Sequence, residues 1–184
     1  MMNDLNEFYT HHGKPTDCIQ PSEDQSHAYT GLLPDALIKQ WRETGWCNVG
    51  DGFIWLVDPD PFHPILRYWI EEEDAFVFAR TGFGNLFVYR NKSIGFLNVH
   101  FGQFTTFPVD FITLFNQVMI DPEFINDVLD KKLFDVARQK LGTLESDECY
   151  SFNPALALGG DKQEKHLIKV KMLPQLLILS QVHG

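Results

Sequence analysis

The order of apolar and polar residues changes character near residue 107. Between residues 74 and 107 the two kinds alternate with a period of two, in three or four runs separated by glycine turns and by Asn91-Lys92. A period of two interrupted by turn residues is typical of an antiparallel meander. From residue 108 to residue 142 the apolar positions return about every 3.6 residues, which indicates helices.

Shorter segments before residue 74 predict two helices and a strand. Residues 32–46 have Pro34 in the first turn, apolar residues at helical spacing and Gly45 as the stop signal. The apolar run at 52–57, rich in β-branched and aromatic residues, predicts a buried strand. A second helix is expected within residues 58–70, with Asp60 as its N-cap.

The two ends of the chain give weaker signals. Residues 3–13 predict a short helix with Asn3 as its N-cap, and residues 14–31, rich in Pro, Ser and Asp, predict a loop. Near the other end, residues 149–158 and 165–172 predict strands, and residues 173–182 predict a last helix.

This order of elements predicts an α+β fold, in which an antiparallel sheet has flanking helices and two subdomains pack together. We divide the chain into an N-terminal helix and loop (1–30), an α+β domain (31–107) and a domain of helices plus short strands (108–184). The 44% of hydrophobic residues indicate that the chain is folded.

Charge limits the class of partner. The formal net charge is −10, and the 15 Lys and Arg are scattered, so we expect no direct binding to nucleic acid. An acidic surface attracts a basic protein and speeds its association, which keeps a protein partner in view.

Cysteine content and the N-terminus bear on location. Three cysteines without CxxC spacing argue against a disulfide framework or a structural zinc site. The N-terminus lacks a basic start followed by an apolar segment, and no apolar run approaches 18 residues. We therefore expect a cytoplasmic protein that does not bind membranes.

Gly159-Gly160 follows an apolar run and could hold a phosphate or form a turn. Phosphate-binding loops place several glycines at fixed spacing before a helix, but the residues after this pair suit a strand. The sequence favours a turn, and ligand contact stays the alternative.

The other candidate metal-binding or catalytic residues also have a structural interpretation. Asp58, Asp60 and His63 could contribute to a cation site, but helix capping explains both aspartates. Cys149 could act as a nucleophile, although its apolar context favours a buried thiol. The seven histidines form no HxxxH or HxH pair and no G-x-S-x-G motif occurs, so we expect no catalytic site, metal or cofactor.

Glu71, Glu72, Glu73 and Asp74 form an acidic run after the helix predicted at 58–70. The helix dipole disfavours acidic residues at this end, so helix stability does not explain the run. It is either a solvated loop or a contact for a basic partner.

Two longer segments resemble known families. Residues 33–62, LRYWI at 66–70 and FARTGFGNLFVY at 78–89 resemble the GAD-like domain, with its helix, Gly-Trp, Gly-aromatic strand, Asp-Pro and aromatic-Gly turn. Residues 130–172 are similar to the Tdi-type C-terminal domain of type VI secretion DNase-immunity proteins, most specifically over LGTLESDECYSFNPALALGG at 141–160.

The resemblance implies a bacterial immunity protein that binds and neutralises a cognate type VI secretion toxin, a nuclease, by blocking its active site or substrate path. The expected contacts are Asp51, Asp58, Asp60, Glu71, Glu72, Glu73 and Asp74. Two alternatives stay open: a regulatory or scaffold module with another protein partner, and an enzyme or small-molecule binder that works at the glycine-rich turns.

Overall fold

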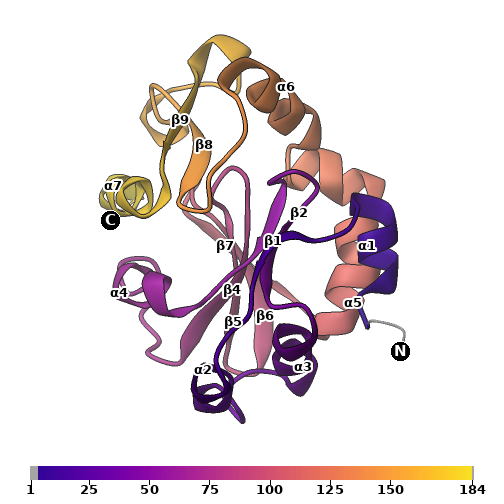
Figure 1. The fold of residues 1–184 in the computed structure, drawn as a ribbon. Coiled ribbons are helices and arrows are strands. Elements are labelled where there is room, and N and C mark those ends of the chain that lie inside the picture. Colours follow the sequence, from indigo (N-terminus) through magenta and orange to yellow (C-terminus); the bar gives the residue numbers. More distant parts are fainter. Residues whose placement is uncertain (1–3, 184) are drawn as a thin grey trace.

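A seven-stranded antiparallel sheet forms the centre of the computed structural model, which describes residues 4–183 (Figure 1). The strands lie side by side in chain order: β1 (Thr16–Ile19), β2 (Trp46–Val49), β3 (Ile54–Leu56), β4 (Ala75–Thr81), β5 (Leu86–Arg90), β6 (Ser93–Asn98) and β7 (Gln103–Phe107). The predicted meander and the predicted strand at 52–57 are confirmed.

The turn between β5 and β6 shows why the sequence encodes this meander. Arg90 pairs with Ser93, and the two residues between them, Asn91 and Lys92, have φ angles of 49° and 59°. A two-residue turn with positive φ at both positions matches the twist of the flanking strands. The tight connection fixes the register, so alternate residues of β5 point to opposite faces of the sheet.

Helices and a second, two-stranded sheet complete the α+β fold predicted from the sequence. The α-helices are α1 (Asn6–His12), α2 (Glu23–Ala28), α3 (Asp35–Glu43), α4 (His63–Leu66), α5 (Phe111–Asn116), α6 (Lys131–Leu141) and α7 (Met172–His183). Shorter 3-10 helices lie at Asp60–Phe62, Val118–Ile120, Leu156–Leu158 and Glu164–His166, with a π-helical turn at Phe124–Val128. Strands β8 (Glu148–Phe152) and β9 (Leu167–Lys171) pair with each other.

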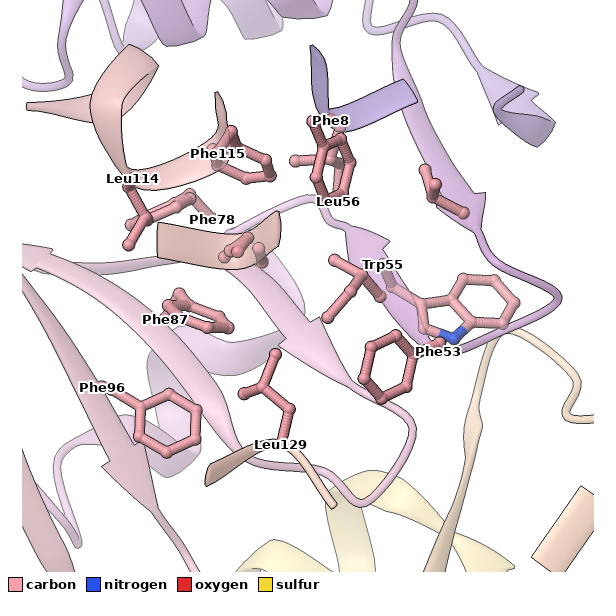
Figure 2. Close-up of a cluster of buried hydrophobic side chains, with 14 of the residues drawn as sticks. Phe8, Phe53, Trp55, Leu56, Phe78, Phe87, Phe96, Leu114, Phe115 and Leu129 are labelled. Carbon is pink, nitrogen blue, oxygen red and sulfur yellow. The ribbon is translucent and has the colours of Figure 1, made fainter. Parts of the chain in front are cut away.

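One face of the large sheet carries α1, α3 and α5 and holds the aromatic core (Figures 1 and 2). The rings of Phe87 on β5 and Phe96 on β6 lie 4.9 Å apart, and Phe8 of α1 meets Phe115 of α5 edge-on at 4.9 Å. Burial of each such side chain stabilises the fold by roughly 1.5–3 kcal/mol. Residues from both sides of position 107 share this core, and the proposed division into three segments stays a prediction.

The opposite face of the sheet is covered by α4, α7 and β8 (Figure 1). Leu66 of α4 and Leu176 of α7 belong to the same buried cluster as Val77 of β4 and Val88 of β5. Among the described residues, the members of this cluster that lie on strands of the large sheet come from β4, β5 and β6, and none comes from β1 or β2.

The loop predicted for residues 14–31 was wrong in two places. Residues 16–19 form β1, and residues 23–28 form α2. Helix α2 begins with a capping box, in which the Ser22 hydroxyl accepts from the Gln25 amide at 3.1 Å and the Gln25 side chain accepts from the Ser22 amide at 2.9 Å. The Pro, Ser and Asp content obscured this local signal.

Two further expectations were wrong. Asp60 does not cap the helix after it; instead, the carboxylate of Asp58 accepts the backbone N–H of Asp60 at 3.0 Å, and α4 ends at Leu66. The strand predicted at 149–158 ends at Phe152 because a 3-10 helix follows. Asn3, expected as the first N-cap, lies outside the described residues.

Candidate functional site

Two neighbouring hollows form a groove beside the edge strand β1. They have volumes of about 770 and 420 Å³ and share four lining residues, Asp17, Ile19, Trp55 and Ser146. One wall is β1 itself, and the other includes the loop Thr143–Asp147 and the start of α7. We call this combined feature the β1 groove.

The groove exists because β1 is an edge strand of the sheet. All four residues of β1 are exposed, and β1 pairs with β2 alone among the described strands. Asn48 of β2 lies opposite Trp55 of β3, and both line the groove. An edge strand with a partly uncovered face is a common place for another chain to bind.

Arg80 holds the far wall of the groove to the sheet. Its side chain is fully buried, its guanidinium lies 4.4 Å above the ring of Trp55, and its Nη2 donates to the carbonyl oxygen of Ser146 at 2.9 Å. Burial lowers the pKa of Arg80 to about 10, so the group is still charged at neutral pH. Arg80 thus connects β4 to the Thr143–Asp147 loop.

Carboxylates dominate the charged groups of the groove. Those among the lining residues are Asp17, Asp51, Asp58, Glu145 and Asp147. The groove-lining cation is Arg138, which pairs with Asp51. The Asp17 carboxylate accepts from Asn48 at 2.7 Å. The groove is therefore negative at neutral pH.

Two of these carboxyl groups have shifted pKa values. Burial raises the pKa of Asp58 above its ordinary value, while the hydrogen bond from the Asp60 amide acts in the opposite direction. The pKa of Asp147 is lowered because its carboxylate accepts a hydrogen bond from Lys171 at 2.8 Å. A cation that binds nearby should therefore stabilise the ionised form of Asp58 more than that of the exposed carboxylates, because the Asp58 carboxylate is partly desolvated.

The structure brings some of the predicted contact residues together and separates others. Asp51 and Asp58 both line the β1 groove. Asp60 is exposed and accepts a hydrogen bond from the Tyr29 hydroxyl. The third predicted feature, the acidic run 71–74, follows α4 and lies outside the groove lining.

The acidic run is exposed, and one of its members has a structural role. Glu72 accepts from Arg90 at 2.7 Å, and the guanidinium of Arg90 lies 4.0 Å from the ring centre of Phe104. Glu71 and Glu73 line a smaller hollow of about 370 Å³ together with residues of α4. Of the seven predicted carboxylates, Asp51 and Asp58 therefore line the groove, the run 71–74 lies apart from it, and Asp60 lines none of these hollows.

Sequence reasoning missed several residues of the groove. Asp17 fell in a segment predicted as a loop, and Glu145 and Asp147 follow α6 without a pattern of their own. Arg80 carried a usable signal, because it is a charged residue at an apolar position of the strand FVFART. A buried arginine of this kind needs acceptors from elsewhere in the fold.

The residues considered for other chemistry have structural roles. Cys149 is buried, and burial raises its pKa to about 12, so it carries a thiol and not a thiolate at neutral pH. Gly159 has φ +87° and Gly160 donates to Ala155 at 3.0 Å, which confirms the predicted turn. Within residues 4–183, no three His, Cys, Asp or Glu side chains are grouped so that they could hold a metal.

Comparison with known sequences places the chain. Residues 3–101, more than half of its length, match the model of the GAD-like domain. The chain belongs to the GAD-like domain family. Residues 111–183 match the C-terminal domain of the T6SS immunity protein Tdi1, so both predicted resemblances are confirmed. The β1 groove takes Ile19 and Trp55 from the GAD-like segment and Met172 from the segment that matches Tdi1.

Structural comparison supports the fold. The crystal structure of Atu4351 from Agrobacterium tumefaciens has a TM-score of 0.76 to this chain, with 16% sequence identity over 96% of this chain and 88% of that one. No curated protein matches the chain. Among the described helices, none is both long enough and apolar enough to cross a membrane.

Proposed function

We propose that this protein binds a toxin delivered by a type VI secretion system and neutralises it without catalysis. The observation that carries the proposal is the match of residues 111–183 to the C-terminal domain of an immunity protein, after a GAD-like segment that ends at residue 101. The proposed toxin is a nuclease, and the proposed place of binding is the cytoplasm, where a nuclease would meet DNA.

Charge supports a nuclease as the partner. A protein that binds DNA presents Lys and Arg to the phosphates, so its active site or substrate path is basic. This chain has a net charge of −10, and carboxylates dominate both the β1 groove and the run 71–74. Complementary charge speeds association, and a bound acidic protein covers the surface that DNA needs.

The proposed contacts are the seven carboxylates named from the sequence. Asp51 and Asp58 act within the β1 groove, with Asp60 close to them along the chain. Glu71, Glu73 and Asp74 extend the acidic surface beyond α4, while Glu72 is already paired with Arg90. In this arrangement the run 71–74 steers the toxin and the groove makes the close contacts.

The test is co-expression with the cognate toxin, taken as the candidate encoded beside this chain. We expect this chain to restore growth, to co-purify with the toxin, and to stop cleavage of DNA by the purified toxin. The control is an immunity protein for an unrelated toxin, expressed at the same level. Growth arrest without rescue, together with the absence of a complex, would sink the proposal.

A further inference from the structure

We propose that the β1 groove receives an extended segment of the toxin in which a large apolar side chain is flanked by Lys or Arg. This inference rests on the proposed function and names the place and chemistry of the contact. It follows from two features of one groove: an apolar hollow large enough for a side chain, and carboxylates around it.

The apolar part is the hollow of about 420 Å³. Trp46, Phe62, Met172 and Leu173 contribute to its lining, and Ile19 lies beside them with 61% of its surface exposed. Pockets that hold small ligands begin at roughly 300 Å³, so an aromatic or long aliphatic side chain fits this space. A large side chain buried here would take Ile19 out of water as well.

The charged part surrounds the same hollow. Asp17, Asp58 and Asp147 are among its lining residues; Asp147 is paired with Lys171, and the described residues that line the hollow include no Lys or Arg. Asp51 and Arg138 neutralise each other farther along the groove. A cation that approaches Asp17 and Asp58 therefore meets carboxylates that are not paired with Lys or Arg within residues 4–183.

The same charges argue against other occupants. Nucleic acid phosphates would be repelled by the carboxylates of the groove. A second copy of this chain carries the same net charge of −10, so two acidic surfaces would have to meet. A segment that combines apolar and basic residues satisfies both parts of the groove, and a basic nuclease is a source of such segments.

Ile19 and Ile178 provide a matched pair for the test. Both are exposed isoleucines, with 61% and 55% of their surface accessible, but Ile178 lies on α7 and does not line the groove. A glutamate at either position should leave folding intact. At position 19 it would place a charge where the apolar side chain of the partner is buried.

The experiment measures the dissociation constant of each variant for catalytically inactive cognate toxin, and thermal unfolding reports on the fold. We expect Ile19→Glu to weaken binding by at least about 30-fold, the scale of an interface hot spot, and Ile178→Glu to change it by less than about threefold. Loss of affinity with an unchanged melting temperature supports the groove.

A photo-crosslinker at position 19 then identifies the toxin segment. With Ile19→p-benzoylphenylalanine, the cross-linked peptide should contain a large apolar residue with Lys or Arg close by; the same group at position 178 should not capture it. Equal binding by both glutamate variants, or capture of an acidic segment, overturns the inference while leaving a neutralising complex intact. If the wild-type chain forms no complex, the proposed function fails, and this inference fails with it.

Discussion

The guanidinium of Arg80 lies 4.4 Å above the ring of Trp55, and its Nη2 donates to the backbone oxygen of Ser146 at 2.9 Å. These contacts connect the GAD-like sheet to the segment that matches Tdi1, because Trp55 lies on β3 and Ser146 lies after α6. The fully buried charge thus fixes one wall of the groove.

Arg80→Lys should be more destabilising than Arg80→Met. Lysine keeps a buried charge but lacks the planar fork that stacks on Trp55 and donates to the carbonyl oxygens of Ser146 and Thr81. Its ammonium is also more strongly hydrated. Methionine loses the same hydrogen bonds, yet it removes the desolvated charge. We expect a loss of about 3–4 kcal/mol for Lys and about 2 kcal/mol for Met, measured by urea unfolding. The reverse order would mean that the charge itself stabilises the fold.

Gly45 determines how closely β1 approaches the turn that precedes β2. It has φ +88°, and a Cβ at this position would lie 2.9 Å from the carbonyl carbon of Ile19. Gly31 has a similar φ of +82°, but a Cβ there would meet nothing within 4 Å. Comparing alanine substitutions at Gly45 and Gly31 therefore distinguishes the backbone strain of a positive φ, which both share, from a steric clash with β1, which only Gly45→Ala would have.

We therefore expect Gly45→Ala to destabilise the protein more than Gly31→Ala. The strain of an alanine at positive φ costs about 1 kcal/mol in both, and the clash adds roughly 1–3 kcal/mol at position 45 alone. Hydrogen exchange should also show weaker protection of β1 in Gly45→Ala. Equal losses in the two variants would show that β1 moves aside without resistance.

The fold could be predicted from the sequence where local signals agree. The meander was visible because alternating residues and turn residues such as Asn91-Lys92 point to the same structure. β1 was not visible, because its four residues are all exposed and its pairing partner lies about 30 residues away. An exposed edge strand has no buried face, so the sequence carries no alternation to find.

The candidate site was predictable only in part. Asp51 and Asp58 were named as acidic residues that could meet a basic partner, and both line the groove. Asp17 and Asp147 belong to it only because β1 and the loop after α6 meet in space, which depends on long-range packing. Local sequence patterns do not predict such a long-range contact. The strand pattern around Arg80 is different, because a charged residue at an apolar strand position indicates a buried charge that needs acceptors.

His100 makes the stability of the protein sensitive to mild acid. Its Nε2–H donates to the Phe83 carbonyl at 2.9 Å, its Nδ1 has no partner within the described chain, and burial lowers its pKa from 6.5 to about 4. The unfolded chain takes up a proton near pH 6.5 and the folded chain does not. The stability present above pH 6.5 is therefore lost as the pH falls from about 6.5 towards 4.

For His100 alone we expect a loss of about 2 kcal/mol in the free energy of unfolding between pH 7 and pH 5. His12 should add to this loss of stability in the same pH range, because burial lowers its pKa to about 4 as well. His100→Gln should reduce the loss, while His27→Gln, at an exposed position, should not. The measurement is urea unfolding at several pH values, and an unchanged pH dependence in His100→Gln would contradict the assignment.

The acidic run after α4 should control the rate at which the toxin arrives. Glu71, Glu73 and Asp74 are exposed and take part in no ion pair within residues 4–183, whereas Glu72 pairs with Arg90. Neutralising the first three as Gln, Gln and Asn, with Glu72 kept, should slow association about 3- to 10-fold at low salt and leave dissociation almost unchanged. Stopped-flow association at several salt concentrations measures both effects.

A second acidic surface supplies the control for this steering effect. Glu123 lies just before the π-helical turn and Asp127 within it; both are exposed, and neutralising them removes two negative charges away from the groove lining. If the steering is local, neutralising Glu71, Glu73 and Asp74 should slow association far more than neutralising Glu123 and Asp127 does. If both variants slow association in proportion to the charge removed, the net charge of −10 governs the encounter and the run has no special position. The dependence of the association rate constant on ionic strength separates these outcomes. A local effect makes this dependence weaker in the variant of the run 71–74 and leaves it unchanged in the variant of Glu123 and Asp127.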